Sequence, residues 1–109
     1  MAYNKSFSFK TIQKRYFNTE LKNGKTLLVG MPKKAVFERM TELQDMQEEK
    51  NNREAYNEMC ALMAEILRNN KQGYKVSAQD IKEGYELEEI IQYFRAYGKF
   101  VNSLAEEKN

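Results

Sequence analysis

The sequence predicts one α+β domain, mainly α, in which a small N-terminal antiparallel β-hairpin or sheet precedes a bundle of three to four helices. Three observations favour this fold class. Two strand-like segments flank the dipeptide Asn23-Gly24, which is common in the turns of β-hairpins. Apolar residues recur at helical spacing along most of the chain after Pro32. The 109 residues include one proline and five glycines, a composition that argues against a disordered chain.

Charge and length indicate one domain with two unlike parts. We expect a β-rich basic part over residues 1–31, a helical part over residues 32–104 and a frayed polar tail over residues 105–109. Residues 1–34 hold eight Lys or Arg and one acid, whereas the remainder holds ten Lys or Arg and fifteen acids. The chain is therefore basic at its front and acidic in its body.

The strands are predicted from alternation and turn chemistry. Phe7 and Phe9 alternate with polar residues, which is the period of a half-exposed strand. Residues 15–21 and 25–31 form the two strands of the hairpin, with a type I′ turn at Asn23-Gly24. Because an isolated hairpin is marginal in water, we expect the first segment to pair with it as well.

Two amphipathic helices follow. Pro32 suits a first helical turn, since its missing N–H would be unpaired there in any case. The first helix should run from about Lys33 to Glu49 and the second from Arg53 to about Asn69, with residues 50–52 as the break. Their apolar stripes are Val36, Met40, Leu43 and Met46 or Gln47 in the first, and Tyr56, Met59, Cys60, Met63, Ile66 and Leu67 in the second.

A short third helix has a readable beginning. Ser77 is a good N-cap, Asp80 stands at the third helical position, and Val76 and Ile81 occupy the positions of a hydrophobic staple. Gly84 should end this helix after about two turns.

The last helix, Glu86 to Leu104, carries more apolar surface than one buried face requires. Its main stripe is Leu87, Ile90, Ile91, Phe94 and Val101, and apolar groups cover roughly half of its circumference. The edge of the stripe consists of Tyr93, Tyr97, Phe100 and Leu104, which we assign as the partner-binding residues. The alternative is that this helix is central to the bundle and the fold covers the edge. A homo-oligomer could also cover it.

Few residues have side chains and spacing suited to catalysis or metal binding. The chain has no histidine, so the commonest general base and metal ligand are missing. Cys60 lies on an apolar stripe and is interpreted as a core residue, and the carboxylates as solvated helix faces. We therefore expect no enzyme activity, no cofactor and no metal site. One cysteine, with no signal-peptide or membrane-spanning pattern, favours the cytoplasm.

The basic front end supports an alternative function, a small nucleic-acid-binding regulatory protein. Aromatic residues on a basic sheet can stack on bases, although no recognition helix or RNA-binding strand motif appears. Lysines also protect a small sheet from edge-to-edge aggregation. The residues concerned are the basic Lys10, Lys14, Arg15, Lys22, Lys25, Lys33 and Lys34 and the aromatic Phe7, Phe9, Tyr16 and Phe17.

In the order and character of its elements, the chain resembles the tail assembly chaperones of long-tailed, siphovirus-type bacteriophages and prophages. The resemblance covers about residues 5–105. It depends on four stretches: Lys25-Thr26-Leu27-Leu28-Val29-Gly30-Met31-Pro32, Glu65-Ile66-Leu67-Arg68-Asn69-Asn70-Lys71, Val76-Ser77-Ala78-Gln79-Asp80-Ile81 and Ile90-Ile91-Gln92-Tyr93-Phe94-Arg95-Ala96-Tyr97.

The resemblance implies a non-enzymatic assembly factor. Members of the family bind the tape-measure protein, keep it soluble and assist assembly of the tail tube, so the major tail-tube protein is a candidate second partner. They act in the host bacterial cytoplasm and are lost from the finished virion. The chain resembles the shorter, non-frameshifted form. Residues 107–109 can be encoded by a run of adenines, which would suit programmed ribosomal frameshifting.

Overall fold

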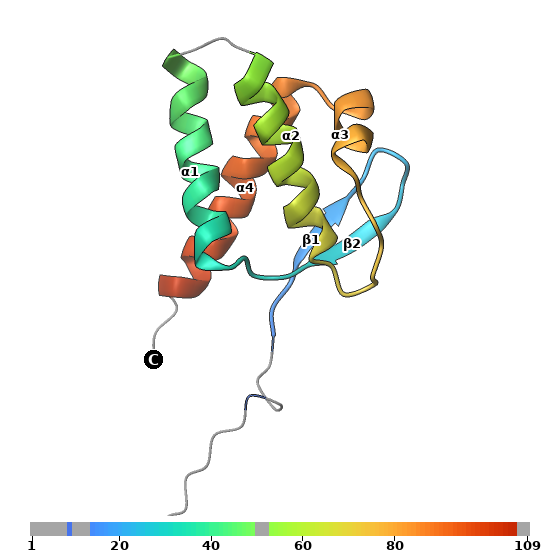
Figure 1. Ribbon diagram of the computed structural model, residues 1–109. Coiled ribbons are helices and arrows are strands. Elements are labelled where there is room, and N and C mark those ends of the chain that lie inside the picture. The colour runs from blue at the N-terminus through green and yellow to red at the C-terminus, as the bar shows by residue number, and fades with distance from the viewer. Residues whose placement is uncertain (1–8, 10–13, 50–52, 107–109) are drawn as a thin grey trace, which may run out of the picture.

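The computed structural model describes Phe9, residues 14–49 and residues 53–106. A two-stranded antiparallel sheet is followed by four helices, which confirms the α+β, mainly α, fold class (Figure 1). The elements are β1 (Phe17–Glu20), β2 (Thr26–Val29), α1 (Lys34–Glu49), α2 (Arg53–Arg68), α3 (Ala78–Gly84) and α4 (Leu87–Glu106).

The hairpin forms where the sequence predicts it, but its turn is of another type. A type I′ turn needs positive φ at both central residues, and of these two only Gly24 has one, at +92°. The Gly24 N–H donates to the Leu21 carbonyl at 2.9 Å, and the Leu21 N–H donates to the Lys25 carbonyl at 2.8 Å. The loop is therefore a three-residue loop with glycine in the left-handed position. The expected I′ turn is wrong because Asn23 keeps an ordinary negative φ.

The outer edge of β2 is covered by the connection between α2 and α3. Val29 makes an antiparallel bridge with Asn70, and the Gly30 N–H donates to the Asn69 carbonyl at 2.8 Å. The expected pairing of the Phe7 segment lies outside the described residues, except for Phe9, which is 80% exposed.

The helices agree closely with the prediction. α1 and α2 each differ from the expected bounds by about one residue, at one end. α3 has the expected capping box, in which the Asp80 N–H donates to the Ser77 hydroxyl and the Ser77 N–H donates to the Asp80 carboxylate. α4 begins at Leu87 and continues to Glu106, so the helix takes up two residues of the expected tail. Residues 107–109 of that tail lie outside the described residues.

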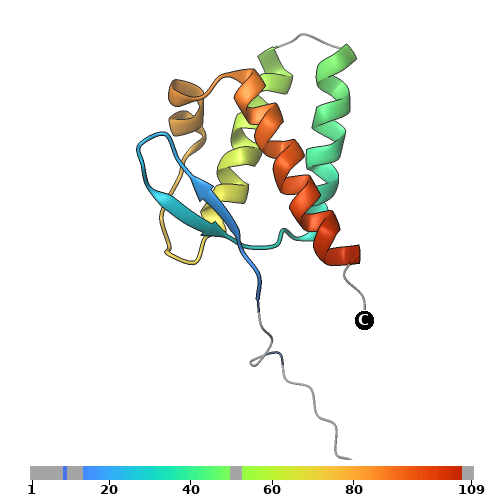
Figure 2. The ribbon, with the colours of Figure 1, turned by 180° about the vertical axis from the view of Figure 1, so that it is seen from behind.

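The core lies between α2, α4 and the inner face of the hairpin (Figures 1 and 2). α2 is its central element, because α1, α3, α4 and β2 all pack against it. The apolar stripe predicted for α2 is buried apart from Tyr56, which is half-buried. No helix in the described part of the chain has the length and apolar character needed to cross a membrane.

Candidate functional site

The aromatic edge of α4 is the principal contact between this helix and the hairpin. The Phe17 ring of β1 lies 5.8 Å from the ring of Tyr93, 5.9 Å from that of Tyr97 and 5.2 Å from that of Phe100. Tyr97 is 1% exposed, and Tyr93, Phe100 and Leu104 are half-buried. The expectation that this edge is surplus to the fold is therefore wrong for Tyr97. The hairpin supplies an aromatic ring that helical periodicity in α4 could not reveal.

Two hydroxyl groups fix this edge to the hairpin. The Tyr97 hydroxyl donates to the Gly30 carbonyl at 2.6 Å, and the Tyr93 hydroxyl lies 2.8 Å from that of Thr19. Burial raises the pKa of Tyr93 to about 12, although the bond to Thr19 acts in the opposite direction. Burial also raises the pKa of Tyr97, and the neighbouring Tyr93 adds to that effect. Both phenols therefore remain protonated at neutral pH and serve as anchors.

In addition to its contacts with the hairpin, Tyr97 lines a surface pocket of about 410 Å³. The pocket lies between the N-terminal end of α1 and the C-terminal end of α2, beside the loop that joins β2 to α1. The Asn69 side-chain amide donates to the Met31 carbonyl at 3.0 Å and holds this loop to the end of α2. The apolar lining is Met31, Pro32, Val36, Ile66 and Tyr97, with the polar residues Lys33, Glu65 and Asn69 beside it.

Met31 gives this pocket an exposed apolar rim. Its side chain is 42% exposed, the second most exposed large hydrophobic residue described, after Phe9. A methionine side chain is flexible and adapts to differently shaped apolar partners. The sequence predicts Met31 as the end of a strand and Val36 and Ile66 as core-facing residues, and Ile66 is indeed buried in the core. Neither alternation nor helical spacing shows that two helix ends stand far enough apart to leave a pocket.

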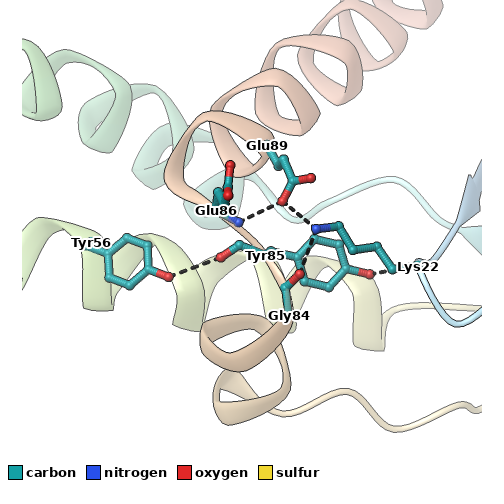
Figure 3. Close-up of polar contacts among 6 residues, drawn as sticks. All are labelled: Lys22, Tyr56, Gly84, Tyr85, Glu86 and Glu89. Atoms are coloured by element: carbon teal, nitrogen blue, oxygen red, sulfur yellow. Dashed lines mark hydrogen bonds and ion pairs between the residues drawn. The ribbon is translucent and has the colours of Figure 1, made fainter.

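A cluster of polar contacts joins the hairpin loop to the connection between α3 and α4 (Figure 3). The Lys22 ammonium lies 2.7 Å from the Glu89 carboxylate and donates to the Gly84 carbonyl at 2.8 Å. The Lys22 backbone N–H donates to the Tyr85 hydroxyl at 3.1 Å, and the Tyr56 hydroxyl donates to the Tyr85 carbonyl at 3.2 Å. Each of these side chains thus has a partner within the fold, so the cluster serves to attach the hairpin.

Glu89 also completes the N-terminal end of α4. Its carboxylate accepts the Glu86 N–H at 2.7 Å, which is a donor that the helix itself leaves unpaired. This bond is the largest cause of the lowered pKa of Glu89, and the Lys22 ammonium adds to it. Glu89 is therefore a stable carboxylate at the positive end of a helix.

The thiol and carboxylate groups considered as candidates for catalysis or metal binding are buried or paired with other side chains. Cys60 is fully buried, and burial raises the pKa of its thiol, so the thiol stays protonated as expected of a core residue. Glu58 forms an ion pair with Arg39 at 2.6 Å. Across Phe9, residues 14–49 and residues 53–106, no three His, Cys, Asp or Glu side chains gather where they could hold a metal ion.

Lysines cover the aromatic rings of the basic region. The ammonium groups lie over the Tyr85 ring (Lys22, 5.0 Å), the Tyr74 ring (Lys25, 4.8 Å) and the Tyr16 ring (Lys71, 5.5 Å). Phe17 points inward onto α4. The rings of Tyr16, Phe17, Tyr74 and Tyr85 are thus engaged within the protein. Stacking on bases would need open ring faces.

Comparisons of this chain with protein families, curated proteins and solved structures give no match.

Proposed function

We propose that this protein is a non-enzymatic tail assembly chaperone of the long-tailed phage type, which binds the tape-measure protein, keeps it soluble and assists tail-tube assembly. The single observation that supports a binding function best is the apolar pocket between α1 and α2, with Met31 exposed at its rim. The nature of the partner follows from the resemblance of the sequence to this family. Phage origin, host cytoplasm and absence from the virion belong to the same proposal.

The pocket suits an apolar side chain of a helical partner. Five of its eight lining residues are apolar, and its volume of about 410 Å³ lies within the range of binding pockets in proteins. An amphipathic helix binds by placing apolar anchors in such a pocket while its polar side stays in water. Lys33 and Glu65 at the margin of the pocket are both exposed, so they are accessible to charged residues of such a helix.

Co-expression with the tape-measure protein of the same phage or prophage tests this function. We expect the wild-type chain to raise the soluble fraction of the tape-measure protein and to co-purify with it. Met31→Asp places a charge beside the apolar pocket and should lower co-purification by about tenfold or more. Met31→Leu should bind normally because it keeps the apolar contact.

Ala61→Asp is the matched control, since it also replaces an exposed apolar side chain by Asp, on α2 away from the pocket lining. Equal co-purification of Met31→Asp and Ala61→Asp would show that the pocket is not the binding site. If wild type leaves the tape-measure protein insoluble and unbound, the chaperone function itself is wrong. Tyr97→Asp is unsuitable as a probe because Tyr97 is buried, and the change would report on folding.

The nucleic-acid alternative has weaker support. Exposed lysines at the hairpin could attract phosphate groups, but the nearby rings of Tyr16, Tyr74 and Phe17 are covered by ammonium groups or packed on α4. Its test is a gel-shift assay at low salt with single-stranded and double-stranded nucleic acid, because such binding weakens steeply as salt rises. A retarded band that disappears with added salt would favour it over the chaperone proposal.

A further inference from the structure

The pocket beside Met31 has charges of opposite sign on its two sides. Lys33 directly precedes α1, and Glu65 lies within the last four residues of α2. These two helix ends lie at the same end of the helical layer (Figure 1), and both residues line the pocket. Both side chains are exposed. The rim of the pocket therefore has a positive side on α1 and a negative side on α2.

The fold does not use these two charges. Within the part of the chain that the structure describes, neither the Lys33 ammonium nor the Glu65 carboxylate has an ion-pair partner, and the two do not pair with each other. Elsewhere on the same two helices, Arg39 and Glu58 do form an ion pair, at 2.6 Å. The charges at the pocket are therefore free to meet charged groups of a bound partner.

Each of these charges also opposes the dipole of its own helix. The beginning of a helix carries a partial positive charge and its end a partial negative charge. α1 nevertheless has no acidic residue in its first turn and begins with Lys33 and Lys34, whereas Glu65 lies near the end of α2. An acid at position 33 and a base at position 65 would suit the helices better. Stability of the fold therefore does not explain the signs of these charges.

A partner helix that crosses the pocket from α1 to α2 can meet both charges at once. Residues one helical turn before and after an apolar anchor share its face and lie about 6 Å to either side of it. Packed helices lie about 8–10 Å apart, so side chains at these two positions reach Lys33 and Glu65 while the anchor fills the pocket. A partner with charges of one sign would be attracted on one side and repelled on the other.

We propose that the pocket selects a helical segment in which one apolar anchor lies between an acidic and a basic residue, each one turn away. The acidic residue meets Lys33, the basic residue meets Glu65, and the anchor contacts Val36 and Ile66. The inference rests on the proposed function, because it concerns the partner of the same pocket. Exposed ion pairs contribute little affinity, so the two charges select among apolar helices rather than bind them strongly.

Three synthetic peptides test this selection. Each is an alanine-rich helix with a leucine anchor, and they differ only in the residues one turn before and after it: Glu and Lys, Glu and Glu, or Lys and Lys. Titration of the full-length chain, followed by NMR at the amides of Val36, Ile66 and Asn69, measures their affinities for the pocket. We expect wild type to bind the peptide with Glu and Lys about threefold or more tightly than either of the others.

Charge reversal should change this preference in a defined way. Lys33→Glu makes both sides of the pocket acidic and should favour the peptide with two lysines, whereas Glu65→Lys should favour the peptide with two glutamates. Lys75→Glu and Glu42→Lys are matched controls, because they change the net charge equally at exposed residues outside the pocket lining. Both controls should keep the preference of wild type.

Melting temperatures separate binding from folding. Both reversals suit the dipoles of their helices, so neither should lower the melting temperature, and a changed preference then reports on the pocket. Equal affinities for the three peptides, no shifts at the pocket, or a preference that the reversals leave unchanged would overturn the proposal. Shifts at the pocket that grow with protein concentration alone would assign it to a second copy and overturn it too. Co-expression with the tape-measure protein tests the chaperone function separately, because the peptide titrations do not involve that protein.

Discussion

The hydroxyl of Tyr97 donates a 2.6 Å hydrogen bond to the backbone carbonyl of Gly30, which joins the middle of α4 to the end of the hairpin. Both residues are buried, and Tyr97 is 1% exposed. The bond fixes the residue from which the chain leaves β2 and turns toward α1. It also positions the Tyr97 ring at the pocket beside Met31.

Replacing Tyr97 by Phe should therefore destabilise the fold. The ring would remain, but the buried Gly30 carbonyl would lose its partner, which costs about 1–3 kcal/mol of the free energy of unfolding. Urea unfolding of both proteins measures the difference. Tyr74→Phe is the matched control, because the Tyr74 hydroxyl accepts an exposed bond from Asn23, and a change within about 0.5 kcal/mol is expected. Equal losses in the two variants would contradict this account of Tyr97.

Two glycine-to-alanine substitutions should change the free energy of unfolding in opposite directions. Gly24 has a φ of +92°, which an alanine adopts only with strain, so Gly24→Ala should lower the free energy of unfolding by about 1–2 kcal/mol. Gly84 ends α3 without positive φ and with open space around its Cα, so Gly84→Ala should raise it by about 0.5–1 kcal/mol. Thermal unfolding under identical conditions compares the two. A stabilised Gly24→Ala protein would show that the loop is not as described.

Glu89 should make the fold sensitive to acid. Its pKa is lowered on folding by the bond from the Glu86 N–H and by Lys22, so the unfolded chain takes up this proton first as the pH falls. The stabilisation is complete above the ordinary value near 4.5 and is lost as the pH falls through the lower value of the folded state. Glu89→Gln should be less stable than wild type at neutral pH and should approach wild type in acid.

Urea unfolding across this pH range, with Glu42→Gln as the control, checks the prediction for Glu89. Glu42 is exposed on α1, and its replacement should not change the pH dependence. A constant difference between wild type and Glu89→Gln at every pH would contradict the role given to this carboxylate.

Tyr93 should make the fold sensitive to alkali. Burial raises its pKa from 10.0 to about 12, so the unfolded chain loses this proton at a lower pH than the folded protein. The stabilisation is complete below pH 10 and is lost between about pH 10 and 12. Tyr93→Phe should lose less stability across this interval than wild type. Near-ultraviolet absorbance follows tyrosine ionisation directly, and full ionisation of all tyrosines near pH 10 without unfolding would refute the assignment.

The elements of the fold could be predicted from local chemistry. Apolar residues at helical spacing predicted the positions of α2 and α4, and the capping residues Ser77 and Asp80 predicted where α3 begins. The turn type could not be predicted, because Asn23-Gly24 is compatible with both a two-residue and a three-residue loop. The choice depends on the register of the strands, which is set by packing against the rest of the protein.

The candidate site could be predicted only in part. Periodicity identified an aromatic edge on α4, but it could not show that Phe17, from a strand far away in the sequence, covers much of it. The pocket beside Met31 was not predicted because it arises between the ends of two helices. Ile66 is a core residue, as its place on the apolar stripe of α2 predicts, and together with the half-buried Val36 it also lines the pocket.

The connection between α2 and α3, which covers the outer edge of β2, has a consequence for the order of folding. The hairpin is local in sequence and closes quickly, yet one of its edges is completed by a segment more than forty residues further along the chain. That segment directly follows α2, so the edge can be completed only after all of α2 has been synthesised. During synthesis, the hairpin therefore leaves the ribosome with its β2 edge still unpaired and becomes a finished sheet only when residues 69–72 follow it.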